Sequence, residues 1–387
     1  MLRDTARPLF NRAIKGQYPP GSTIKPAGAL IALDEGVISP DFGIGCGGAY
    51  LGCRRPIKCT HNTAGHAGNL RVALANSCNS YFSHIYRLAL DNPRLSGTVN
   101  GYLKWKQYMN SFGLGVKLGV DLPSEDKGLI VDTSFYNKLY NRSWNSCTNV
   151  FLGIGQGEMQ ATPLQMANMM CIIANKGFYY TPHIVKSIDG QTAADTILNR
   201  YKVRHNVTNI PVDIYEIVQL GMQDVIESGT GRVARIEGIS VAGKTGTAEN
   251  YGLIYGKREK LKDHSWFVCF APRENPKIAV AVIVENAGYG ATWAGPMAGL
   301  IMEKFLKDTL SAVRWKEVER IEQTEIILPI VKTKRARLDS LRQQRIRKLQ
   351  MRATAHRSNG PGPGRNIPLK IPFNKEATIN HHEEQFI

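Results

Sequence analysis

Three short patterns in this chain carry residue types suited to nucleophilic chemistry. Ser22-Thr23-Ile24-Lys25 places a hydroxyl three residues before a lysine, and such residues are neighbours on one face of a helix. A serine hydroxyl needs an adjacent base, and a lysine can serve where burial and nearby positive charge lower its pKa. Ser77-Cys78-Asn79 and Lys244-Thr245-Gly246-Thr247 follow in that order. The three together predict an enzyme that opens an amide through an acyl-serine intermediate.

Each pattern is common by chance, and the chain repeats two of them. Ser124-Glu125-Asp126-Lys127 has the first spacing, but it follows Pro123 and precedes Gly128, so we expect a loop there. Ser143-Trp144-Asn145 has the second spacing within a polar stretch, whereas K-T-G occurs once. The prediction therefore depends on the order of the three patterns and on their contexts, which are a helix start, a helix and a strand.

The first two patterns require helices to position them. Pro19-Pro20-Gly21 predicts a turn, and apolar residues at helical spacing indicate a helix over 22–34, with Pro26 tolerated in its first turn. The N-terminus of that helix supplies positive potential and free N–H groups. A second helix is predicted over 70–90, and its Ser77 and Asn79 are expected to relay protons and to hydrogen-bond Lys25.

The third pattern lies in a predicted strand over 238–247. Gly243 and Gly246 leave room for another backbone to approach, so a substrate peptide is expected to bind along this strand as an added strand. The ammonium group of Lys244 and the hydroxyls of Thr245 and Thr247 suit a substrate carboxylate.

The secondary structure expected for the rest of the chain predicts an α+β fold. Residues 69–176 are expected to be mostly helical, 177–210 to form short strands or loops, and 213–228 to form a helix. Two strands over 265–271 and 277–285 precede a closing helix over 296–310. A strand, a hairpin and a terminal helix indicate an antiparallel sheet covered by helices, with a mainly helical subdomain.

The chain resembles the transpeptidase domain of class B penicillin-binding proteins over about residues 5–310. The run Gly16-Gln17-Tyr18-Pro19-Pro20-Gly21-Ser22 is similar to the elongation-type member, penicillin-binding protein 2. The stretches 152–157 and 161–167 are similar to another part of these proteins. Thr162 and Gln165 also fit a capping box, with Pro163 at the first helical position.

This resemblance implies a fold like that of the penicillin-binding transpeptidases and serine β-lactamases, and a peptidoglycan D,D-transpeptidase activity. Ser22 would be the acylated nucleophile and Lys25 its general base, with Ser77 and Asn79 relaying protons and contacting substrate. The segment Lys244-Thr245-Gly246-Thr247 would bind the peptide carboxylate. The backbone N–H groups of Ser22 and Thr247 would form the oxyanion hole. The chemistry itself requires no cofactor.

The resemblance also implies partners and a location. Peptidoglycan stem peptides would be the substrates, and β-lactams would acylate Ser22 in their place. The expected protein partner is a membrane glycosyltransferase of the elongation machinery that maintains cell shape, and the expected location is the periplasmic face of the inner membrane.

The N-terminal region departs from the family. Family members carry a membrane anchor and begin several tens of residues before the nucleophile, with strands that join the central sheet. Here 21 residues precede Ser22, no apolar run approaches the roughly 20 residues that span a bilayer, and Met1 starts no signal peptide. We therefore expect an N-terminally truncated transpeptidase domain over residues 1–310, without its anchor and some sheet strands.

The seven cysteines predict a metal site or a disulfide. Some elongation-type relatives carry a zinc site in this part of the chain, and the expected structural zinc ligands here are Cys46, Cys59, His66 and Cys78. His61 is the rival histidine, and Cys53 is the alternative cysteine. The competing prediction is a disulfide such as Cys46–Cys59, which is plausible outside the cytoplasm.

Positive charge gathers at the C-terminus. The chain has a formal net charge of +17, and residues 331–387 hold 13 Lys/Arg against 4 Asp/Glu. Residues 311–387 are therefore predicted to be a basic tail, partly helical and then disordered. The tail lacks interleaved aromatic residues, so we expect no nucleic-acid partner. A solvated tail and contact with anionic lipid or glycan polymers both remain open.

Three other functions share the motifs. A serine β-lactamase needs a base and a positioned water for deacylation, and no glutamate for that role is identified here. A non-catalytic β-lactam sensor or scaffold would bind penicillin without cross-linking stem peptides. A DD-carboxypeptidase would use water as the acceptor. Penicillin turnover and a donor–acceptor cross-linking assay discriminate among them.

Overall fold

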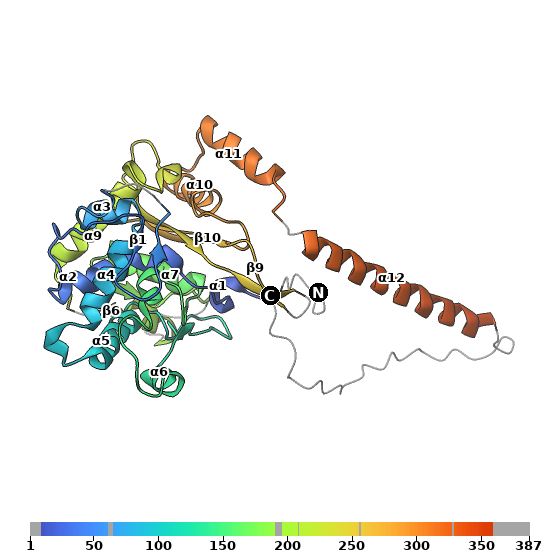
Figure 1. The fold of residues 1–387 in the computed structure, drawn as a ribbon. Helices are drawn as coiled ribbons and strands as arrows, with labels where there is room; N and C mark the ends of the chain where they lie inside the picture. The colour runs from blue at the N-terminus through green and yellow to red at the C-terminus, as the bar shows by residue number, and fades with distance from the viewer. Residues whose placement is uncertain are drawn as a thin grey trace. The chain divides into compact units, whose positions relative to one another are not determined.

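A computed structural model describes residues 9–60, 65–189, 196–207, 209–254, 257–326 and 329–358 (Figure 1). The chain divides into two compact units. The first includes Arg7–Asn250 and Leu261–Thr324, and the second includes Tyr251–Lys260 and the chain from Glu325 onward. All three sequence patterns lie in the first unit.

The central sheet of the first unit has three antiparallel strands in the order β11-β10-β7. β7 spans Ala242–Ala248, β10 spans His264–Ala271 and β11 spans Ile278–Val284. The two hairpin strands are thus confirmed. The third predicted strand begins at Ala242 instead of 238, because Ile236 and Ile239 pair across a turn at Gly238, whose φ is +74°.

Helices cover both faces of this sheet, which confirms the predicted α+β architecture. Successive β10 side chains point to opposite faces. Phe267 and Cys269 pack into one apolar cluster with residues of α10 (Ala294–Lys307), and Trp266 and Val268 join the larger core, which includes α2 (Lys25–Asp34) and α7 (Pro163–Ala174). The predicted capping box at the start of α7 is present, with Thr162 and Gln165 bonded reciprocally.

The helical segments around the first two patterns differ in detail from the prediction. Ser22 lies in a short 3₁₀ helix, η1 (Gly21–Ile24), which runs directly into α2. The single helix predicted over 70–90 is wrong, because it is two helices, α3 (Leu70–Ala75) and α4 (Asn79–Leu90). The break falls at Ser77, whose φ of +54° lies in the left-handed region and cannot continue an α-helix.

The remaining elements are mostly short. The other helices are α1 (Arg12–Lys15), α5 (Thr98–Ser111), α6 (Thr133–Leu139), α8 (Thr196–Asn199), α9 (Val212–Glu227), α11 (Ala312–Gln323) and α12 (Pro329–Ser358). Further 3₁₀ helices are η2 (Pro93–Leu95), η3 (Val150–Ile154), η4 (Arg200–Lys202) and η5 (Arg232–Ala234). Two-stranded pairs join β1 (Ala49–Tyr50) to β2 (Ile57–Lys58), β3 (Leu129–Ile130) to β4 (Met159–Gln160), β5 (Phe178–Tyr180) to β6 (Arg204–Asn206), and β8 (Tyr251–Ile254) to β9 (Lys257–Lys260).

Two observations complete the comparison with the sequence. The repeated Ser124–Lys127 spacing lies in a loop, as predicted, with Ser124 at a φ of +66°. Within the predicted tail, the structure describes two helices, α11 and α12. Helix α11 belongs to the first compact unit and α12 to the second. Residues 359–387 lie outside the described ranges. In the part of the chain that the structure covers, no helix combines the length and apolar character needed to cross a membrane.

Candidate active site

The Ser22 turn is fixed by close backbone contacts. Gly21 has a φ of +55°, and its N–H donates to Gly155 O at 2.8 Å. A Cβ on Gly21 would lie 2.7 Å from Thr247 O, so no side chain fits between this turn and β7. Ser22 itself is partly exposed, and among the described residues its hydroxyl makes no hydrogen bond. The turn therefore presents a hydroxyl that is available for reaction.

Lys25 lies one 3₁₀ turn beyond Ser22 and is completely buried. Its Nζ donates to Ser77 O at 2.7 Å, to Ser77 Oγ at 3.1 Å and to Asn79 Oδ1 at 2.6 Å. Burial penalises the charged amine and lowers the pKa of Lys25 to about 7. A substantial fraction of Lys25 is therefore neutral near pH 7, which is the form that can accept a proton.

The break between α3 and α4 positions both partners of Lys25. The left-handed backbone of Ser77 lets its carbonyl and its hydroxyl reach the same amine. The amide of Asn79 is oriented from its other side, because Nδ2 donates to Lys58 O at 2.8 Å and so directs Oδ1 toward Lys25. Sequence reasoning did not identify Lys58; its only signal was its place directly before Cys59 in the cysteine-rich stretch.

β7 lies at the edge of its three-stranded sheet and contacts η1 directly. A Cβ on Gly246 would lie 2.7 Å from Thr23 Cγ2 and 3.2 Å from Pro20 O, so glycine permits this close packing. Thr247 O accepts a hydrogen bond from Gln156 Nε2 at 3.4 Å. The N–H and C=O of one residue in an antiparallel strand point to the same edge, so the Thr247 N–H also points away from β10.

The hydroxyl and amine groups of the K-T-G pattern are unequally accessible. Lys244 is fully buried, and its Nζ donates to Thr245 O at 3.1 Å. Burial holds the pKa of Lys244 well below its usual value, and the positive charge of Lys25 lowers it further. Thr245 Oγ1 lies 2.7 Å from Thr230 Oγ1, whereas Thr247 is partly exposed. Thr230 gave no signal in the sequence.

The three patterns therefore meet, although 52 and more residues separate them in the chain. Ser22 and Lys25 occupy one turn, Ser77 and Asn79 bond to Lys25, and Thr247 packs its backbone against that turn. This arrangement places a free hydroxyl, a lysine with a lowered pKa and an edge strand together, which is what acyl transfer from a peptide requires.

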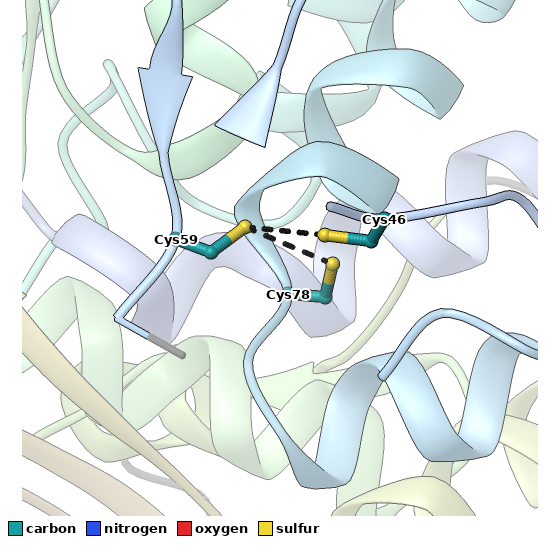
Figure 2. Close-up of side chains that lie close together, drawn as sticks. All are labelled: Cys46, Cys59 and Cys78. Atoms are coloured by element: carbon teal, nitrogen blue, oxygen red, sulfur yellow. Dashed lines mark hydrogen bonds between the residues drawn. The ribbon is translucent and has the colours of Figure 1, made fainter. Parts of the chain in front are cut away.

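Three cysteines form a cluster beside this site. The sulfurs of Cys46, Cys59 and Cys78 all lie within 4.8 Å of one another, and Figure 2 shows them converging from separate segments. The Cys46–Cys59 and Cys59–Cys78 sulfur distances are 3.7 and 4.0 Å. Four-coordinate zinc with Zn–S bonds of about 2.3 Å places its thiolates about 3.8 Å apart, so the donor set and spacing fit this ion.

The other predicted metal ligands lie elsewhere or outside the described ranges. Cys53 forms a disulfide with Cys147, so its suggested role as an alternative ligand is wrong. Cys46 and Cys59 are free thiols in this structure. His66 is not among the described residues whose ligand atoms gather in the cluster, and His61 lies outside the described residues.

Residues 2–306 match the family model described as the penicillin-binding protein transpeptidase domain. The match covers most of the chain, and the chain belongs to this family. It is 34% identical over 329 residues to the peptidoglycan D,D-transpeptidase MrdA of Haemophilus influenzae; the alignment covers 81% of this chain and 48% of that relative. The chain thus spans about half the length of the curated relatives it matches.

Solved structures of similar fold also belong to penicillin-binding proteins. A crystal structure of Pseudomonas aeruginosa PBP2 in complex with WCK 5153 has a TM-score of 0.66 and 33% identity, covering 81% of this chain and 67% of that one. A complex between PBP2 and MreC from Helicobacter pylori has a TM-score of 0.63 and 25% identity, covering 80% of this chain and 53% of that one. The chain is therefore similar to the PBP2 members of its family in both sequence and fold.

Proposed function

We propose that this chain is the acyl-transfer part of a peptidoglycan D,D-transpeptidase and that Ser22 is its nucleophile. The observation that carries the proposal is the buried amine of Lys25, which lies one turn from a free serine hydroxyl and is held by Ser77 and Asn79. Relatives that are named D,D-transpeptidases support the choice of reaction.

In the first half of the reaction, neutral Lys25 accepts the proton of Ser22 as the serine oxygen attacks the D-Ala-D-Ala amide. The N–H groups of Ser22 and Thr247 stabilise the oxyanion of the tetrahedral intermediate. Lys25 then returns the proton through the Ser77 hydroxyl to the departing D-alanine amine. The carbon–nitrogen bond breaks, and an ester to Ser22 remains.

In the second half, the amine of a neighbouring stem peptide attacks this ester. The amine loses a proton, the new amide forms, and Ser22 regains its hydroxyl as the carbon–oxygen bond breaks. Atoms and protons balance over the two halves, so the products are one cross-link and one D-alanine.

The donor peptide is proposed to extend along the open edge of β7. The Thr247 hydroxyl contacts the terminal carboxylate, because it is the partly exposed hydroxyl of the pattern. Lys244 and Thr245 are buried and support the site from the interior of the protein. The negative charge of the bound carboxylate favours the charged form of Lys244. The hydroxyl of Thr245 is held by a hydrogen bond to Thr230. Because Gly246 has no side chain, η1 can pack closely against β7 at this position.

The proposal includes a structural zinc ion held by Cys46, Cys59 and Cys78, with His66 as the predicted fourth ligand. The sulfur spacing supports three of these four ligands. Bound zinc would link the cysteine-rich segment to the start of α4. Cys59 follows Lys58, whose carbonyl orients Asn79, so this segment helps to hold the partner of Lys25 in place.

The proposed location is the periplasmic face of the inner membrane. The Cys53–Cys147 disulfide supports an oxidising compartment, and the PBP2 relatives support this cell-wall role. A protein of the kind bound in the Helicobacter pylori PBP2–MreC complex, together with a membrane glycosyltransferase, is the proposed partner class.

The test is labelling with a fluorescent penicillin followed by mass spectrometry of the adduct. We expect Ser22→Ala to lose labelling completely. Ser124→Ala, which removes the serine of the repeated spacing, should label normally. A donor–acceptor stem assay then distinguishes cross-linking from hydrolysis and from binding alone. Undiminished labelling of Ser22→Ala would refute the proposal.

A further inference from the structure

Helix α11 contacts two segments that flank β7. It lies beyond residue 306, where the family match ends, yet it belongs to the same compact unit as the candidate site. Its two arginines, Arg314 near the start and Arg320 near the end, donate to backbone carbonyls outside the helix. The role of this helix is therefore a question about the site as well as about stability.

Arg314 fastens the start of α11 to the segment that follows Thr230. Its guanidinium pairs with the buried carboxylate of Glu303 at 3.1 Å and donates to Val233 O at 3.0 Å and to Arg235 O at 2.5 Å. These carbonyls lie in η5 and just after it. The same segment begins at Thr230, whose hydroxyl bonds to that of Thr245 on β7.

Arg320 fastens the end of α11 to the loop over residues 289–293. Its guanidinium lies over the ring of Trp293 at 4.7 Å and donates to Thr292 O at 2.9 Å. Glu317, one turn earlier, accepts from the same guanidinium and so fixes its plane. Arginine is suited to this site because it can stack on an aromatic ring and donate in the plane at once.

The 289–293 loop in turn rests on β7 and β10. Ser265, which pairs with Thr247, donates to Tyr289 O at 2.9 Å and accepts from Ala294 N at 3.1 Å. A Cβ on Gly290 would lie 2.5 Å from Gly246 O, so the loop backbone touches the strand directly. Displacement of the loop would therefore be transmitted to the strand positions next to η1.

We propose that α11 is a positioning element for the candidate site and that Arg314 and Arg320 are its positioning residues. They hold the Thr230 segment and the 289–293 loop, and these in turn fix Thr245, Gly246 and Thr247. Neither arginine touches the reacting atoms. This inference rests on the proposed function, since the geometry it protects is that of acylation at Ser22.

The test measures the second-order rate constant of acylation by fluorescent penicillin, together with the active fraction from saturated labelling. We expect Arg320→Ala to lower the rate constant about tenfold, as misplaced site groups do. Arg320→Lys should recover part of the loss, because it retains a cation over Trp293. Lys316→Ala is the matched control, since it removes an exposed charge from the same helix. A merely structural role would lower the active fraction and the Tm and leave the rate constant unchanged.

Hydrogen exchange of the full chain separates failure of this inference from failure of the proposed function. If the unmodified chain is not acylated by penicillin, the proposed function fails. The hydrogen-exchange rates alone then decide whether α11 positions the candidate site. Faster exchange at 245–247 and 289–293 in Arg320→Ala than in Lys316→Ala supports it. Exchange equal to the control overturns it, as does a rate constant equal to that of the unmodified chain where acylation is measurable.

Discussion

At the scale of single residues, the site depends on the contrast between Ser22 and Lys25. The serine is partly exposed and its hydroxyl makes no hydrogen bond to any described residue, whereas the lysine is buried and has three acceptors. Burial is the largest influence on the pKa of Lys25: it disfavours the charged amine by more than the negative charges of Cys78 and Cys59 favour it, and the pKa falls to about 7.

A pH profile of acylation tests this balance. The neutral amine of Lys25 is the proposed base, so the rate should rise as the pH passes upward through about 7 and then level off. Lys25→Arg should lose at least about a hundredfold, because arginine stays protonated in proteins. Stopped-flow measurement of penicillin acylation from pH 5.5 to 9 checks both. A flat profile for the unmodified chain would contradict the assignment of Lys25.

The sequence predicted residues whose chemistry is local. Ser22, Lys25 and the Thr162 capping box depend on spacings of three residues, which one helical turn brings to the same side. Thr230 and Lys58 were missed, because each acts through one hydrogen bond to a distant segment and neither residue type nor spacing marks such a bond.

At the scale of elements, the break between α3 and α4 matters more than either helix. Periodicity predicted one helix over 70–90, because the apolar positions on both sides keep the same spacing. The chain instead turns at Ser77, and Cys78, the N-cap of α4, lies buried beside Cys46 and Cys59. A left-handed serine leaves no trace in hydrophobic periodicity.

Metal removal tests how that break is held. If zinc joins the three sulfurs, a strong chelator should lower the Tm by several degrees and slow acylation, because Lys58 then no longer fixes Asn79. Metal analysis of the purified protein should find about one zinc per chain. Cys46→Ser should lose the metal, and Cys171→Ser, which changes a thiol outside the cluster, should keep it. Metal-free protein with unchanged acylation would contradict the zinc prediction.

At the scale of the whole molecule, the predicted class was correct because long strands and the closing helix are strongly patterned. The disulfide was not predicted, since Cys53 and Cys147 are 94 residues apart and cysteine counts do not determine pairing. It connects the cysteine-rich segment to the loop before η3. Arg87 on α4 reinforces this connection by donating to Gly52 O and Ser146 Oγ.

Removing the disulfide should weaken the folded state without removing the site. A double Cys53→Ser, Cys147→Ser variant is expected to lose about 2–4 kcal/mol of unfolding free energy, because the open chain gains entropy when unfolded. Its folded fraction should still be acylated at Ser22. Chemical denaturation with parallel penicillin labelling measures both quantities. Equal stability of the variant and the parent would show that the cross-link does not stabilise the fold.

On the proposed function, the crowding around Gly21 limits which substitutions could reduce acylation by a β-lactam. Its backbone touches Gly155 and Thr247 so closely that even one added methyl group collides with main-chain atoms, which cannot rotate away. If Ser22 is the nucleophile, as proposed, a mutation at this turn would impair acylation by the natural peptide donor along with acylation by the drug.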